Sequence, residues 1–231
     1  MPQHILDEYF NGQLMKLFSY SLLFLLSSCT AQSYFKSPND VCKKKAVLYL
    51  RNKPEVTGSL TIPFEQNFNR SPANVQTLKF IPEGATQEDN IQVTEVIGYS
   101  IGKDYYALKN LFLFTDNRYH LLFAKRMTSE DSKMQLYELY ESGKGNVTGE
   151  SEYSYFISLS TFNQNETLNT HSIRLIPDFD QKMSELVSDC PSLAQKIRSK
   201  ENGYFIPLVS FKTFKHKEVM FKIVNEYNNC H

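Results

Sequence analysis

The chain has 231 residues, which is enough for one domain or for two small ones. Its 25 Lys and Arg balance its 25 Asp and Glu, and this zero net charge argues against a nucleic-acid-binding protein, which carries a basic excess. The hydrophobic content of 41% and the aromatic content of 13% exclude an acidic, disordered chain. Because a chain of this length buries about 70% of its unfolded surface, its core needs no disulfide or metal to hold it together.

Residues 15–32, MKLFSYSLLFLLSSCTAQ, have the pattern of an export signal. Met15 and Lys16 form a short positive start, about ten largely apolar residues follow, and small residues come next. About 20 apolar residues are needed to span a bilayer core, so this run is too short for a membrane anchor. Residues 1–14 place Asp7 and Glu8 where a signal should be positive. We therefore expect translation to start at Met15 and residues 1–14 to be an over-extended start.

Leu26-Ser27-Ser28-Cys29 resembles a bacterial lipobox, in which an aliphatic residue and two small residues precede the cysteine that receives the lipid. Cys29 is therefore the predicted lipid-attachment site, and the acyl chains would hold the protein to one membrane leaflet. The alternative is ordinary cleavage after Ala31 or Gln32, which would release the protein. The expected location is the bacterial outer membrane or the periplasm, with secretion as the alternative.

The cysteine pattern agrees with export, because the four cysteines form no C-x-x-C pair and no histidine stands at zinc-finger spacing. Cys190 and Cys230 each end a predicted helix, so a disulfide between them is a candidate. It would stabilise the fold by about 3–4 kcal/mol through loop closure. The alternative is two free thiols. In either case Cys42 is left over.

Residues 33–45 are polar, end in three lysines, and are predicted to form a tether. From residue 46, short apolar or alternating runs separated by turn residues predict an antiparallel sheet and not β-α-β units. The expected strands cover residues 46–50, 56–63, 75–81, 91–101, 105–108, 112–114, 119–126, 134–140, 153–162 and 173–176.

From about residue 178 the apolar period becomes helical, with Asp178 as the expected N-cap of the first helix. A second short helix is expected to begin at Pro191 and to be broken by Gly203. A final helix carries an apolar stripe. The stripe consists of Val219, Met220, Ile223, Val224 and Tyr227. The predicted fold is α+β: a single domain over 46–231, with a mainly antiparallel β-sheet core and C-terminal helices packed on it.

The motifs of several common enzyme classes are missing: the chain has no H-E-x-x-H, Walker A or dinucleotide-binding glycine pattern. We therefore expect no catalytic, cofactor-binding or metal-binding residues, and the balance leans against an enzyme. The histidines at 120, 171, 216 and 231 lie far apart in the sequence. The acidic groups are expected to serve a helix start (Asp178 and Asp180), a loop (Glu130 and Asp131) and a turn (Glu88-Asp89-Asn90).

The chain has 14 tyrosines and 17 phenylalanines but no tryptophan. Exposed tyrosines can form a surface that binds carbohydrate or peptide. Tyr137, Tyr140, Tyr153 and Tyr155 would do so if they share one face of the sheet, and the alternative is that they fill the core.

Five segments define the layout of the chain: Leu26-Ser27-Ser28-Cys29, Val56-Thr57-Gly58-Ser59-Leu60, the run from Val96 to Tyr106, Leu186-Val187-Ser188-Asp189-Cys190-Pro191, and the run from Val224 to Cys230. In this layout the chain resembles the uncharacterised exported proteins common in Bacteroidota, which have no assigned activity. The resemblance implies an envelope protein with a β-rich core and C-terminal helices, and it supplies no catalytic residues.

The sequence thus predicts an exported envelope protein with a non-enzymatic binding or scaffolding role. Its expected partner is the membrane, through the lipid on Cys29, and no nucleic acid. The alternatives are a small-molecule carrier, or a hydrolase whose site forms only in the folded chain. A carrier requires an enclosed apolar cavity, a hydrolase requires converging titratable groups, and a scaffold requires an exposed aromatic patch or edge strand.

Overall fold

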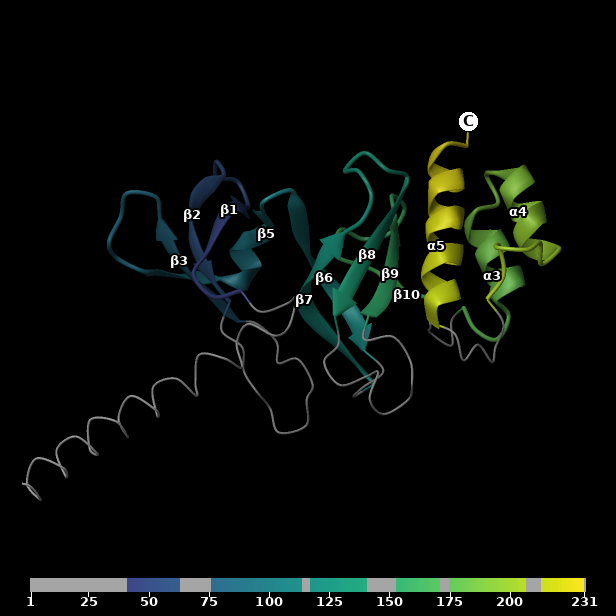
Figure 1. The fold of residues 1–231 in the computed structure, drawn as a ribbon, viewed down its shortest axis with the longest axis horizontal. Coiled ribbons are helices and arrows are strands. Elements are labelled where there is room, and N and C mark those ends of the chain that lie inside the picture. Colours follow the sequence, from purple (N-terminus) through teal and green to yellow (C-terminus); the bar gives the residue numbers. More distant parts are fainter. Residues whose placement is uncertain are drawn as a thin grey trace, which may run out of the picture.

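The computed structural model describes residues 41–62, 76–113, 117–140, 153–170, 175–206 and 213–230, with 213–215 as backbone only. Within these residues ten strands form one antiparallel sheet in the order β10-β9-β8-β7-β6-β5-β1-β2-β3-β4, and three helices follow (Figure 1). The predicted mainly antiparallel α+β fold is confirmed. The strands are β1 (Lys44–Leu50), β2 (Val56–Thr61), β3 (Thr77–Pro82), β4 (Asp89–Gln92), β5 (Val96–Ile101), β6 (Asp104–Leu113), β7 (Arg118–Arg126), β8 (Met134–Tyr140), β9 (Tyr153–Leu159) and β10 (Leu168–Asn169), and the helices are α3 (Phe179–Leu186), α4 (Pro191–Arg198) and α5 (Thr213–Asn228).

Several predicted boundaries differ from the observed ones. The strand predicted over 91–101 is divided into β4 and β5 by a 3-10 helix, Val93–Glu95, which buries Val93 and turns Glu95 outward to an ion pair with Lys53 at 3.2 Å. The strands predicted over 105–108 and 112–114 are one strand, β6. Leu175 and Ile176, the described part of the strand predicted over 173–176, lie in no strand.

The folded part also begins earlier than the tether predicted over 33–45 allows. Val41 is buried in the core of the first half of the sheet, and its carbonyl oxygen accepts a hydrogen bond from the Ile62 amide at 2.8 Å. Lys44 already belongs to β1. The three consecutive lysines are all exposed, so no buried position among them indicated the start of the strand.

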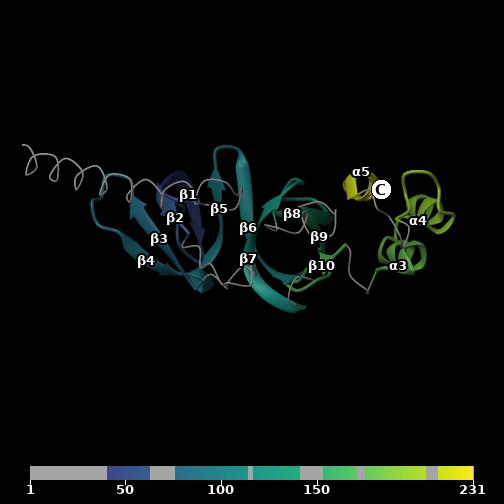
Figure 2. The same ribbon diagram turned by 60° about the horizontal axis from the view of Figure 1, so that its bottom comes forward.

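Strands β6 and β7 are central to the architecture because each buries both of its faces. On β6, Ala107 and Leu111 pack into one core, whereas Leu108 packs into another on the opposite face. On β7, Leu122 and Phe123 divide between the same two cores. The sheet therefore continues to either side of this pair, with β1–β5 on one side and β8–β10 on the other (Figure 2).

The last strand returns to β6, so strands β6 to β10 close on themselves in what we call the curled unit. The Asn110 amide donates to the Asn165 carbonyl oxygen at 2.9 Å, and Thr167 Oγ1 donates to the Asn110 carbonyl oxygen at 2.8 Å. One step further along, Asn169 Nδ2 donates to the Phe112 carbonyl oxygen at 2.9 Å. Side chains on the inner face of the curled unit are consequently enclosed by strands.

The three helices cover the outer face of β8 and β9. Met134 and Ile157 from the strands share one core with Met220 of α5 and Leu193 of α4. Figure 1 shows α5 beside β8 and β9, with α3 and α4 beyond it. The predicted apolar stripe of the final helix is confirmed, because all five of its residues are buried. None of the helices described is long and apolar enough to cross a membrane.

Candidate functional site

A polar hollow of about 390 Å³ opens at one end of the curled unit. Its walls come from β6, from β8 and β9, and from the two loops 127–133 and 160–167. Its volume is at the lower end of the range for small-molecule sites. The polar and charged residues that line it are Lys109, Glu130, Asp131, Ser132, Lys133, Gln135, Ser158, Ser160, Asn163 and Gln164.

Lys109 lies at the inner end of this hollow. It shares the inward-facing register of β6 with Ala107 and Leu111, so its side chain enters the polar end of an otherwise apolar interior. Its Nζ donates to the Gln164 carbonyl oxygen at 2.8 Å and lies 5.0 Å from the centre of the Tyr137 ring. No carboxylate in the described part of the chain forms an ion pair with it.

The environment of Lys109 disfavours its positive charge. Burial lowers the pKa of Lys109, and the nearby positive charge of Arg126 lowers it further. Arg126, on β7, lies with its guanidinium carbon 4.3 Å from the centre of the Tyr105 ring, and only 16% of its side chain is exposed. Arg126 does not line the hollow, so Lys109 is its half-buried cation, with the charge of Arg126 nearby.

The negative charges stand at the outer rim. Glu130 Oε2 lies 3.4 Å from Arg126 Nη2, yet 87% of the Glu130 side chain is exposed. Asp131 is exposed, and a hydrogen bond from Ser129 lowers its pKa, so it is a carboxylate at neutral pH. The half-buried charge of the hollow is thus the Lys109 ammonium, and its exposed charges are Glu130, Asp131 and Lys133.

Hydrogen bonds to Gln135 and Gln164 hold parts of the wall in place. The Tyr137 hydroxyl donates to Gln135 Oε1, and burial raises the pKa of Tyr137 to about 12, so this hydroxyl keeps its proton at neutral pH. Gln164, whose carbonyl oxygen binds Lys109, is fixed from the other half of the sheet, because its Oε1 accepts a hydrogen bond from Arg51 Nη1 at 3.2 Å. These wall residues are therefore positioned by contacts within the chain, without a ligand.

A second hollow of about 390 Å³ lies between α3 and the chain around β10. Phe162 borders both hollows. Apolar side chains (Leu168, Leu175 and Leu186) share its wall with charged ones (Lys182 and Glu185). Both hollows are open to solvent and have charged walls, so neither is the enclosed apolar cavity that a carrier of apolar molecules requires.

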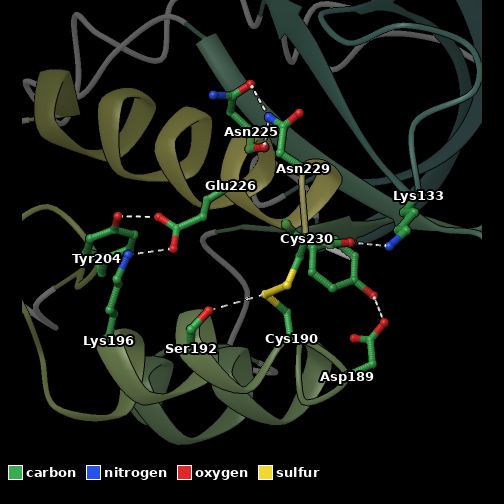
Figure 3. Close-up of a disulfide and its surroundings, with 11 residues drawn as sticks. Lys133, Asp189, Cys190, Ser192, Lys196, Tyr204, Asn225, Glu226, Asn229 and Cys230 are labelled. Carbon is green, nitrogen blue, oxygen red and sulfur yellow. Dashed lines mark hydrogen bonds and ion pairs between the residues drawn. A yellow bond between two sulfur atoms is a disulfide. The ribbon is translucent and has the colours of Figure 1, made fainter.

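The structure joins Cys190 and Cys230 in a disulfide across a sequence separation of 40, with Cα atoms 6.0 Å apart (Figure 3). Around it, Glu226 of α5 accepts a hydrogen bond from the Tyr204 hydroxyl and another, at 2.7 Å, from Lys196 Nζ of α4. Cys42 is free and half-buried. Cys29, the predicted lipid-attachment site, lies outside the described residues, as do residues 1–40 as a whole.

Among the described residues, the other candidates from the sequence do not assemble into one centre. His120 is buried on β7, and His216 is buried on α5 with its Nε2 at 2.7 Å from Thr170 Oγ1. His171 and His231 lie outside the described residues. Asp178 pairs with Lys182 at 3.5 Å and makes no side-chain cap, and Asp180 pairs with Lys200 at 3.4 Å. Where the chain is described, no three His, Cys, Asp or Glu residues gather to hold a metal.

Two local expectations need correction. The Glu88-Asp89-Asn90 run is not simply a turn, because Asp89 and Asn90 pair with β3 as part of β4. The four tyrosines do not share a face, because Tyr137 packs into the inner core of the curled unit, whereas Tyr155 packs on the helix side. Among the described large hydrophobic residues only Ile97 and Tyr119 are exposed, which leaves little for an aromatic binding patch.

Sequence reasoning missed Lys109, although the sequence contains a signal for it. Alternate residues of 105–113 read Tyr, Ala, Lys, Leu, Leu, which places one lysine on the apolar face of a strand. Gln164 gave no such signal, because it reaches the hollow only through the loop that carries the chain from β9 to β10.

No family model, no curated protein and no solved structure matches this chain. The basis for a functional proposal is therefore the geometry of the chain itself.

Proposed function

We propose that this is an exported, non-enzymatic binding protein whose curled unit takes a small polar ligand in the hollow around Lys109. The observation that carries the proposal is a half-buried ammonium with no carboxylate partner in the described residues, at the inner end of a built polar hollow. Burying a charge without a counter-charge costs stability. A charged residue in such an unfavourable environment is expected to bind a ligand.

The residues around the hollow support a ligand-binding role better than they support a hydrolase or an aromatic docking surface. A hydrolase requires a nucleophile with a base in hydrogen-bond reach, and the serine nearest the inner wall, Ser158, instead donates to the Glu166 carbonyl oxygen at 2.9 Å. A scaffold that docks through aromatic side chains requires an exposed cluster of them, and Tyr119 is the one exposed aromatic residue among those described.

A ligand screen with an occluding variant tests the binding role. Ser160 is exposed and lines the hollow, so Ser160→Trp should fill its mouth without entering the core. Thr94→Trp, at an exposed position in the first half of the sheet, is the matched control. We expect some members of a library of small polar metabolites to bind the wild type and Thr94→Trp but not Ser160→Trp. A library with no hits, or hits that ignore Ser160→Trp, would overturn the proposal.

Export and lipid attachment at Cys29 complete the proposal, with the membrane as the partner through the lipid and no nucleic acid bound. The signal-like run 15–32 and the lipobox-like residues 26–29 support it. The test is the intact mass of the protein from native membranes. A chain that starts at Cys29 and carries acyl groups is expected, and Cys29→Ser should leave the membrane fraction. A lipid-free chain starting near residues 32–34 would support plain secretion instead.

A further inference from the structure

We infer that the ligand of the hollow is a small zwitterion, such as a free amino acid or a short peptide, whose carboxylate binds Lys109 and whose ammonium faces Glu130 and Asp131. This inference rests on the proposed binding function and names the class of ligand. It follows from how the charges are arranged between the inner end and the rim of the hollow.

The inner end favours a carboxylate. An ammonium has three donors, and Lys109 Nζ uses one of them on the Gln164 carbonyl oxygen. The face of the Tyr137 ring adds an electrostatic contact and accepts no further conventional hydrogen bond. A carboxylate oxygen would take a remaining donor in a charge-assisted hydrogen bond, and it would also neutralise a charge that burial disfavours.

The rim favours a positive charge. The Glu130 carboxylate lies 3.4 Å from Arg126 Nη2 and is otherwise largely exposed, and Asp131 carries its negative charge into solvent. Lys133 also lines the hollow, but its Nζ donates to the Cys230 carbonyl oxygen at 2.5 Å and is turned toward the helices. A ligand with an ammonium at its outer end therefore meets two carboxylates there.

The same rim disfavours ligands of higher negative charge. A phosphate group would satisfy Lys109, but its second negative charge and any further ones would lie close to Glu130 and Asp131. A neutral polyol would leave the charge of Lys109 uncompensated. Charge complementarity thus selects a molecule with one negative and one positive end.

Four probes separate these cases by ligand-observed NMR and titration calorimetry on the full exported chain. They are a pool of free amino acids with glycylglycine, the same amino acids as α-amides, the same as N-acetyl derivatives, and inorganic phosphate. We expect binding from the first pool, at least tenfold weaker binding from the amides, and weaker binding from the N-acetyl derivatives. Amides that bind as well as free amino acids, or phosphate as the tightest probe, would overturn the inference.

A variant assigns the effect to Lys109. Lys109→Met keeps the length of the side chain and removes its charge, and it should lose at least tenfold in affinity for the amino-acid pool. Lys79→Met, an exposed lysine on β3 in the other half of the sheet, should bind as the wild type does. Equal affinity of Lys109→Met and wild type would overturn the inference.

The two proposals fail in different ways. If the polar-metabolite library gives hits that Ser160→Trp abolishes, but the amino-acid pool does not bind, the binding function stands and the zwitterion inference falls. If neither the library nor the pool binds, both fall. An amino acid that binds equally to Ser160→Trp would place its site elsewhere and would also overturn the inference.

Discussion

Lys133 Nζ donates a hydrogen bond to the backbone carbonyl oxygen of Cys230 at 2.5 Å, which joins the wall of the hollow to the residue that anchors the end of α5 (Figure 3). At the first residue of β8, the Met134 amide donates to Asn228 Oδ1 at 2.8 Å, and Asn228 Nδ2 donates to the Met134 carbonyl oxygen at 2.9 Å. The start of β8 is therefore held by the C-terminal helix. The hollow depends on the helical layer for the position of its wall.

The first prediction concerns the disulfide that secures this layer. Replacing Cys190 and Cys230 together by serine should lower the free energy of unfolding by about 3–4 kcal/mol, because the bridge restricts a long loop of the unfolded chain. Urea denaturation measures the change. Cys42→Ser, which removes a free and half-buried thiol, is the control and should change stability little. Equal stabilities of the double variant and the wild type would show that the bridge does not hold the layer.

The second prediction separates a binding role of Lys109 from a structural one. Its lowered pKa means that the folded chain holds this proton less tightly than the unfolded chain does, so the charged form opposes folding at neutral pH. Lys109→Met should therefore leave the free energy of unfolding at pH 7 unchanged or raise it by about 1 kcal/mol. Thermal and urea unfolding measure this effect. A decrease of more than about 1 kcal/mol would make Lys109 a structural residue.

The third prediction concerns Gly58, where strands β2 and β3 approach closely. A Cβ at this position would lie 2.3 Å from the Ile81 carbonyl oxygen and 2.6 Å from a ring carbon of Phe80. Gly58→Ala should lower the free energy of unfolding by about 1–3 kcal/mol, because the backbone or the buried ring must move. Ser59→Ala, the neighbouring position on β2, is the control. Denaturation midpoints that coincide for Gly58→Ala and wild type would contradict this packing.

The fourth prediction is a pH dependence that arises from Glu226. Burial would raise the pKa of this carboxyl, but the hydrogen bonds from Lys196 and Tyr204 outweigh it, and the net effect lowers the pKa below its ordinary value of 4.5. The contribution of Glu226 to stability is therefore present above pH 4.5 and is lost as the pH falls through the lowered value.

Glu226→Gln should consequently lose stability at pH 7 and show a smaller further loss on acidification than the wild type. Glu218→Gln, at an exposed position on the same helix, should follow the wild-type profile. Unfolding measured from pH 7 to pH 3 tests both variants. Parallel curves for Glu226→Gln and wild type would contradict the assignment.

Local patterns in the sequence predicted most of the secondary structure. Apolar runs located β8 at its observed bounds and β7 to within one residue, and the helical period located the buried stripe of α5. The prediction was wrong at Val93–Glu95, where the alternation, with Glu95 as its polar exception, continues through a 3-10 helix. Two tertiary contacts determine the backbone conformation there. They are the burial of Val93 and the ion pair of Glu95 with Lys53.

The candidate site was much less predictable. Lys109 could have been noticed on its apolar face, but its neighbours Arg126, Tyr137 and Gln164 come from three further segments. Only the return of the chain from β9 to β6 brings Gln164 to the Lys109 ammonium. The sequence alone does not predict that this part of the chain closes on itself, because the hydrogen bonds of Asn110 to Asn165 and Thr167 join residues more than 50 positions apart.

The most direct test of the account is a titration of the protein with the free amino-acid pool, followed through the backbone amide signals in ¹⁵N–¹H NMR spectra. We predict shifts that cluster at Lys109, Gln135, Ser160 and Gln164 and that disappear in Lys109→Met. Shifts confined to other parts of the chain, or no shifts at millimolar ligand, would contradict the claim that this hollow is a binding site for zwitterions.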